Sequence, residues 1–197
     1  MPNINTKFTL SGEKEYQQAI SKIGDNMRML NSEMRKVETA YARNADSVEA
    51  LTAKNAVYQK EIDKQKEKIE TYRKAVKAAQ DAQDAQNKKL EEAAKTLDKG
   101  SDEYKSIAEG AETARKKVEK WQTSLNNAEA ELNNLNNKLD ENKEKIEESG
   151  KETGNLGDVV SGLTEKFGIK LPEGMQKSMN SMGSLNTTSV KIAGGFV

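Results

Sequence analysis

A heptad pattern runs through most of this chain. Between residues 13 and 149, apolar and aromatic side chains recur at two positions in every seven, and the segment contains no proline. So narrow a stripe is typical of a coiled-coil seam, because the outer helix of a globular protein has a wider apolar face. The pattern predicts an all-α protein of long heptad-patterned helices, arranged as a coiled coil or as antiparallel helical hairpins.

The seam follows two series of positions, a (20, 27, 34 and onward to 146) and d (23, 30, 37 and onward to 149). Every aromatic side chain between 20 and 149 falls on one of them, and Tyr16 lies one heptad before the first d position. A single helix would leave this stripe in water, so the pattern favours self-association or hairpin closure. The clearest seam residues are Ile20, Met27, Leu30, Met34, Val37, Val48, Leu51, Tyr58, Ile62, Ile69, Tyr72, Val76, Leu90, Leu97, Tyr104, Ile107, Val118, Trp121, Leu125, Leu132, Leu135, Leu139 and Ile146.

Asn55 is a polar residue on an a position of this seam. A buried Asn at such a position can fix the register and the oligomeric state of a coiled coil. It can equally be a tolerated, partly wet position. The sequence leaves both interpretations open.

Two places look like turns, near 44–46 and 98–102. Gly100 suits the left-handed residue after a helix, and Ser101 suits the cap of the next one. In the earlier segment Asn44 takes the place of the glycine, and Asp46 or Ser47 could cap.

With both turns, helices near 13–43, 47–98 and 102–149 fold back on one another as antiparallel hairpins. The alternative is one uninterrupted rod of about 205 Å, at a rise of 1.5 Å per residue. The heptad register continues through both breaks, so the rod remains an alternative from sequence alone.

The regions flanking this helical part differ from it. Residues 1–12 alternate in a strand-like way, with Ser11 as the expected cap of the first helix. Residues 150–197 are rich in glycine and predict short helices near Asp158 and Pro172. The last residues turn apolar, so we expect the region to continue into a longer protein.

The composition disfavours several classes of function. The chain has no Cys and no His, which removes disulfides, the usual zinc sites and Ser-His or Cys-His nucleophiles. We therefore expect no catalytic, cofactor-binding or metal-binding residues. Lysine and arginine balance aspartate and glutamate at 32 each, which gives nucleic acid or an anionic membrane little attraction. The sequence predicts a structural protein, not an enzyme.

Several segments resemble the tail tape measure proteins of phages, prophages and phage-tail-like particles of Gram-positive bacteria. They are Phe8–Tyr16, Leu30–Met34, Leu51–Asn55, and Trp121 followed by Leu125–Leu132. The resemblance implies a long, mostly helical protein inside the tail tube whose residue count sets tail length during assembly, with tail tube and tail assembly proteins as its partners. It also implies a place in the host cytoplasm during assembly and then in the virion tail.

A generic coiled-coil spacer or adaptor of a bacterial secretion or envelope machine is the alternative. Its partners would bind the methionine-bearing C-terminal region. The heptads do not distinguish it from a tape measure, because both need only long helices. Both interpretations share an expectation of self-association and of no membrane contact from this segment.

Overall fold

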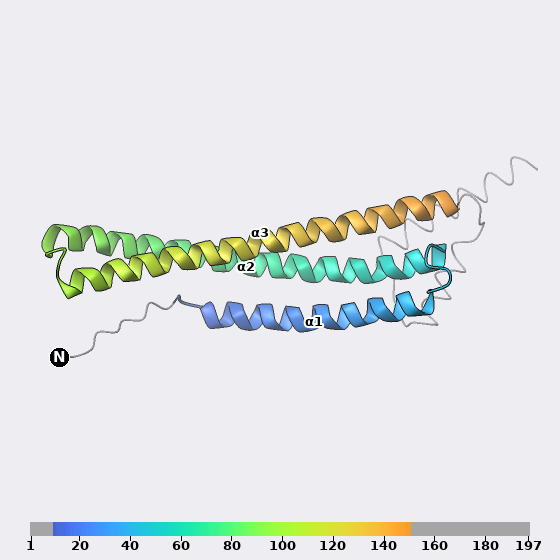
Figure 1. Cartoon of the computed structure of the whole chain (residues 1–197), viewed down its shortest axis with the longest axis horizontal. Coiled ribbons are helices and arrows are strands. Elements are labelled where there is room, and N and C mark those ends of the chain that lie inside the picture. The colour runs from blue at the N-terminus through green and yellow to red at the C-terminus, as the bar shows by residue number, and fades with distance from the viewer. Residues whose placement is uncertain (1–9, 151–197) are drawn as a thin grey trace, which may run out of the picture. The chain divides into compact units, whose positions relative to one another are not determined.

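The structure is a computed structural model that describes residues 10–150 (Figure 1). It consists of α1 (Glu13–Ala40), α2 (Val48–Thr96) and α3 (Asp102–Gly150), and the described residues form no strand. The all-α prediction is therefore confirmed. The strand-like pattern of 1–9 and the short helices of 151–197 lie outside the described residues.

The helices end where the sequence suggested turns, so the described chain is not an uninterrupted rod. Between α1 and α2, Asn44 N donates to Tyr41 O (2.9 Å) and Ser47 N donates to Asn44 O (3.1 Å). Ser47 Oγ then accepts from Ala50 N (3.2 Å), so Ser47, and not Asp46, caps α2.

The turn between α2 and α3 depends on two side chains. Asp98 Oδ1 accepts from Gly100 N (2.7 Å), which closes a local turn of the kind that Asp favours. Ser101 Oγ accepts from Tyr104 N (3.2 Å) and so caps α3 as predicted.

Two predicted backbone details are wrong. The only described residue with positive φ is Gly12 (77°), so neither Gly100 nor Asn44 is left-handed. Both turns are instead closed by hydrogen bonds between groups two or three residues apart.

The expected Ser11 cap of α1 is also wrong, because Gly12 occupies the position before the helix. Glu13 N donates to Leu10 O (3.2 Å), and Tyr16 N donates to Gly12 O (3.0 Å). The positive φ of Gly12 is the value that a type II turn over 10–13 requires at its third residue.

The described residues form two units, and each helix contributes to both. The first unit comprises 10–25 of α1 and the preceding turn, 65–96 of α2, and 102–132 of α3 with the turn before it. Its helices α1 and α3 both run opposite to α2 (Figure 1). Its core contains Leu10, Ile69, Ala75, Val76, Ala79, Trp121, Leu125 and Ala128.

The second unit comprises residues 26–64 and 133–150 of the described chain. Its core contains Met34, Val37, Val48, Leu51, Ala53, Ala56, Val57 and Ile146. Lys60 on α2 pairs with Glu33 on α1 (2.7 Å), while Asn55 on α2 bonds Asn142 on α3 (2.9 Å). Within this unit α2 therefore contacts both other helices and has two buried faces.

Candidate functional site

The apolar seam residues named from the sequence are shielded from solvent, fully or in part. None of the 23 apolar and aromatic seam residues named from the sequence is exposed; each is buried or half-buried. In the first unit these are Ile20, Ile69, Tyr72, Val76, Leu90, Leu97, Tyr104, Ile107, Val118, Trp121, Leu125 and Leu132. In the second they are Met27, Leu30, Met34, Val37, Val48, Leu51, Tyr58, Ile62, Leu135, Leu139 and Ile146.

Two apolar residues outside the seam have opposite environments. Val57 is 0% exposed, whereas Met29 is 64% exposed. Val57 lies one turn before Lys60, whose ammonium pairs with Glu33 of α1, so Val57 is on the α2 face toward α1. A seam-based interpretation treats these two residues alike and misses this second buried face.

Asn55 forms the centre of a buried polar contact in the second unit. Its side chain is 1% exposed, and its Oδ1 accepts from Asn142 Nδ2 at 2.9 Å. Asn142 lies on the d series of α3, opposite the a position of Asn55. The α2–α3 interface therefore pairs one side-chain amide with another at this level. If one helix shifted along the other, this hydrogen bond would break and the buried Asn55 amide would be left without a partner, which is unfavourable.

Truncating only one of these amides is expected to destabilise the second unit. Asn142→Ala leaves the Asn55 oxygen buried without its donor, at a cost of about 1–3 kcal/mol. Replacing both, as Asn55→Leu with Asn142→Leu, is expected to be close to neutral because no buried polar group remains. Urea unfolding followed by circular dichroism measures both; equal losses in the single and the double variant would contradict a specific pair.

Gln65 makes a second buried polar contact, which lies in the first unit. Its Nε2 donates to Ala128 O (2.8 Å) and to Glu131 Oε2 (2.9 Å) across the α2–α3 interface. Lys68 Nζ lies 3.5 Å from the same carboxylate oxygen. Within the described chain Gln65 Oε1 accepts no hydrogen bond, although the residue is 0% exposed. The sequence signal for Gln65 is its place in the d series, which puts a polar residue on the seam.

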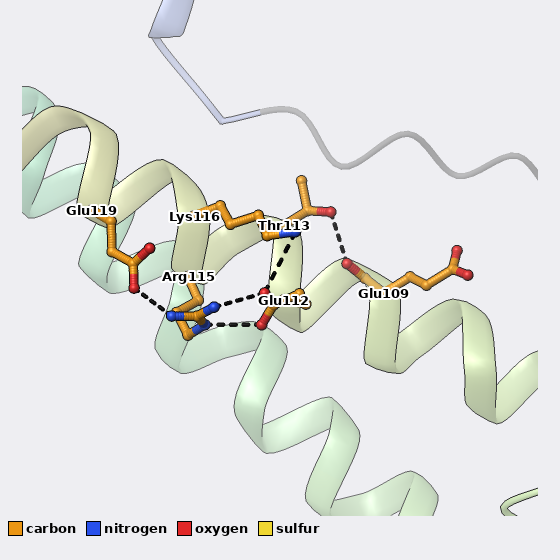
Figure 2. A network of polar contacts seen from close by, with 6 residues as sticks. All are labelled: Glu109, Glu112, Thr113, Arg115, Lys116 and Glu119. Carbon is orange, nitrogen blue, oxygen red and sulfur yellow. Dashed lines mark hydrogen bonds and ion pairs between the residues drawn. The ribbon is translucent and has the colours of Figure 1, made fainter.

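A network of charged side chains lies along the part of α3 between Glu112 and Glu119 (Figure 2). Arg115 donates to both carboxylate oxygens of Glu112 (2.7 and 2.8 Å) and also pairs with Glu119, while Lys116 lies 3.6 Å from Glu112. The hydrogen bonds from Arg115 lower the pKa of Glu112 to about 2, and the same bonds raise the pKa of Arg115. Both groups stay charged at neutral pH and offer no proton for acid–base chemistry.

Two tyrosines have raised pKa values because they are partly buried beside carboxylates. Burial is the main cause for Tyr58, followed by Glu61, Glu38 and Glu141. Burial also raises the pKa of Tyr41, with Glu49 adding to it. A raised pKa keeps the phenol neutral, so neither side chain is an activated nucleophile or base.

The described residues include no group of three or more side chains that could hold a metal ion. Across 10–150, no helix has both the length and the apolar character to cross a membrane.

Comparison with protein-family models, with curated proteins and with solved structures finds no match. The contacts described above hold the three helices together within each unit.

Proposed function

We propose that this chain is a structural protein of a phage or phage-like tail, related to tail tape measure proteins, that acts as a helical ruler during assembly. The segments from Phe8–Tyr16 to Leu125–Leu132 support the family, and the three long helices support the mechanism. An α-helix has a fixed rise of 1.5 Å per residue, so a long helix is a length standard. The tail tube and tail assembly proteins are its proposed partners.

The observation that carries this proposal is that α3 has ion pairs between its own residues. Glu112, Arg115 and Glu119 pair at spacings of three and four residues, without help from another helix. Such pairs stabilise a helix locally. We propose that α3 remains helical when α2 and α3 separate, which lets the chain change from a folded form to an extended ruler.

The finer proposal for the folded form is that the heptad seam makes coiled-coil contacts. The burial of seam residues such as Leu51, Ile62 and Leu139 agrees with it, as does the polar level at Asn55. The same seam would drive association with further copies after opening, since its apolar stripe would then be exposed.

A spacer or adaptor of a bacterial secretion or envelope machine is the second candidate. The capped turns favour it, because Ser47 and Ser101 each bond the backbone of the next helix and so stabilise the folded form. A spacer would work folded, with a length set by the paired helices. A ruler would work extended.

Shortening the chain distinguishes the two candidates. Within the first unit, a Cβ at Gly110 of α3 would lie 3.4 Å from Gln86 Oε1 of α2. Deleting residues 84–90 and 107–113 therefore removes one heptad from each side of this pairing and leaves the remaining helices in register. If the segment is an extended ruler, the 14 missing residues shorten the tail by about 21 Å. Electron micrographs of assembled particles measure the difference.

The length-preserving variant Lys89→Ala with Lys105→Ala is the matched control, since both side chains are exposed on the same two helices. Its tails should have wild-type length. Wild-type length in the deletion variant would dismiss the ruler for this segment and leave the adaptor. Absence of the chain from purified tails by mass spectrometry would dismiss the tail function itself.

A further inference from the structure

Two ion pairs join α2 to α3 in the first unit. Lys68 Nζ lies 3.5 Å from Glu131 Oε2, and Arg73 Nη2 lies 2.9 Å from Glu129 Oε1. In both pairs α2 supplies the cation and α3 supplies the carboxylate. The two helices therefore carry opposite charges where they meet.

The sequence extends this difference beyond the two pairs. Residues 65–77 of α2, which we call the basic segment, contain five Lys or Arg and two Glu. Residues 119–131 of α3, which we call the acidic segment, contain three Glu and one Lys. Helices of opposite charge attract one another, whereas two copies of the basic segment would repel. Charge therefore favours α3 over a second α2 as the partner of the basic segment.

Gln65 makes this choice of partner stricter, because its side chain is 0% exposed. Its Nε2 donates to Ala128 O (2.8 Å) and to Glu131 Oε2 (2.9 Å). A buried donor that loses its acceptor is unfavourable. Lysine and arginine side chains only donate, so most charged residues of a second basic segment could not replace the Glu131 carboxylate.

We propose that the basic segment binds the acidic segment of a second copy of this chain when the α2–α3 hairpin opens. Two copies then associate by exchanging α3, so that α2 of each copy pairs with α3 of the other, and α2 does not pair with α2. The ion pairs and the Gln65 contact of the hairpin recur between the copies, which is how domain swapping forms dimers. Such pairing requires the opening and association proposed above, but no tail function.

Refolding a mixture of isotopes tests which helices pair between copies. Full-length heavy- and light-isotope protein is unfolded together in urea, refolded at high concentration and separated by size. The dimer is then treated with a carbodiimide, which joins a lysine to a carboxylate in contact with it. We expect heavy–light peptides that join Lys68 to Glu131, the pair that the single chain forms internally. Heavy–light peptides that join one α2 to another, or refolding to monomers alone, would overturn the proposal.

A pair of charge-reversed variants measures the selectivity. Arg73→Glu puts two carboxylates together at the Glu129 contact, and Glu129→Arg puts two guanidinium groups together there. When heavy Arg73→Glu protein refolds with light Glu129→Arg protein, a mixed dimer that exchanges α3 relieves both repulsions. We expect mixed dimers to exceed their statistical ratio to the unmixed dimers by about two- to fivefold, the size expected for an exposed ion pair.

The matched control uses Lys77→Glu in place of Arg73→Glu. Lys77 belongs to the basic segment, is exposed and lies off the seam, so the same charge change is made away from the seam. Its mixture with light Glu129→Arg protein should give the statistical ratio. Equal ratios in the two mixtures would overturn the proposal. Neither mixture contains tails, so this result would leave the tail-length prediction untouched.

Discussion

Replacing Val57 with aspartate is expected to destabilise the second unit strongly. The Val57 side chain is 0% exposed within the core that includes Val37 and Leu51. A carboxylate placed there loses its hydration, and we expect a cost of about 4 kcal/mol or more. Since whole domains are stable by only about 5–15 kcal/mol, a loss of this size is a large share of the unit's stability. Urea unfolding followed by circular dichroism at 222 nm measures the loss.

Met29→Asp is the matched control, because Met29 is also apolar, helical and outside the seam. Its side chain is 64% exposed, so the same substitution should change stability by no more than about 0.5 kcal/mol. Similar losses in the two variants, or a wild-type midpoint for Val57→Asp, would contradict the burial of the α2 face toward α1.

This pair of residues shows how far the sequence alone could predict the core. The two-in-seven stripe identified residues such as Leu51 and Ile62, which are 1% and 2% exposed. It did not identify the second buried face of α2, which contains Ala53, Ala56 and Val57. Alanine is common in cores and on helix surfaces alike, so its position carries little information until the third helix is placed.

The positions of the two turns could be predicted from the sequence, but their backbone conformation could not. A serine able to cap follows each break, and Ser47 and Ser101 do cap α2 and α3. The left-handed conformation expected at Gly100 and Asn44 was wrong because other groups close these turns. In the second turn the Asp98 carboxylate bonds Gly100 N directly, so no positive φ is needed. Such side-chain competition for backbone groups is hard to infer from composition.

The buried polar contacts could also be predicted only in part from the sequence. Asn55 was recognised as a polar residue on the seam, but its partner Asn142 was not, and neither was the contact of Gln65 with Glu131. Pairing across antiparallel helices depends on which levels of the two helices meet. That depends on the length and geometry of the turn at 97–101, which the heptad pattern does not contain.

Replacing Trp121 with alanine is expected to cause a similarly large loss of stability in the first unit. Trp121 is 5% exposed, and its ring centroid lies 6.0 Å from that of Tyr72 at an interplanar angle of 51°. Removing a buried Trp side chain leaves a cavity that surrounding helices fill only in part, at about 3–5 kcal/mol. Because Trp121 is the single tryptophan, unfolding must be followed by circular dichroism instead of fluorescence.

Trp121→Phe separates the loss of the ring contact from the loss of volume. Phenylalanine keeps an aromatic ring near Tyr72 and fills more of the cavity, so we expect this variant to lose clearly less stability than alanine. Lys120→Ala changes an exposed neighbour on α3 and should stay within about 0.5 kcal/mol of wild type. If Trp121→Ala cost no more than Lys120→Ala, the side chain could not lie between α2 and α3, and the seam would not be the surface that holds the first unit together.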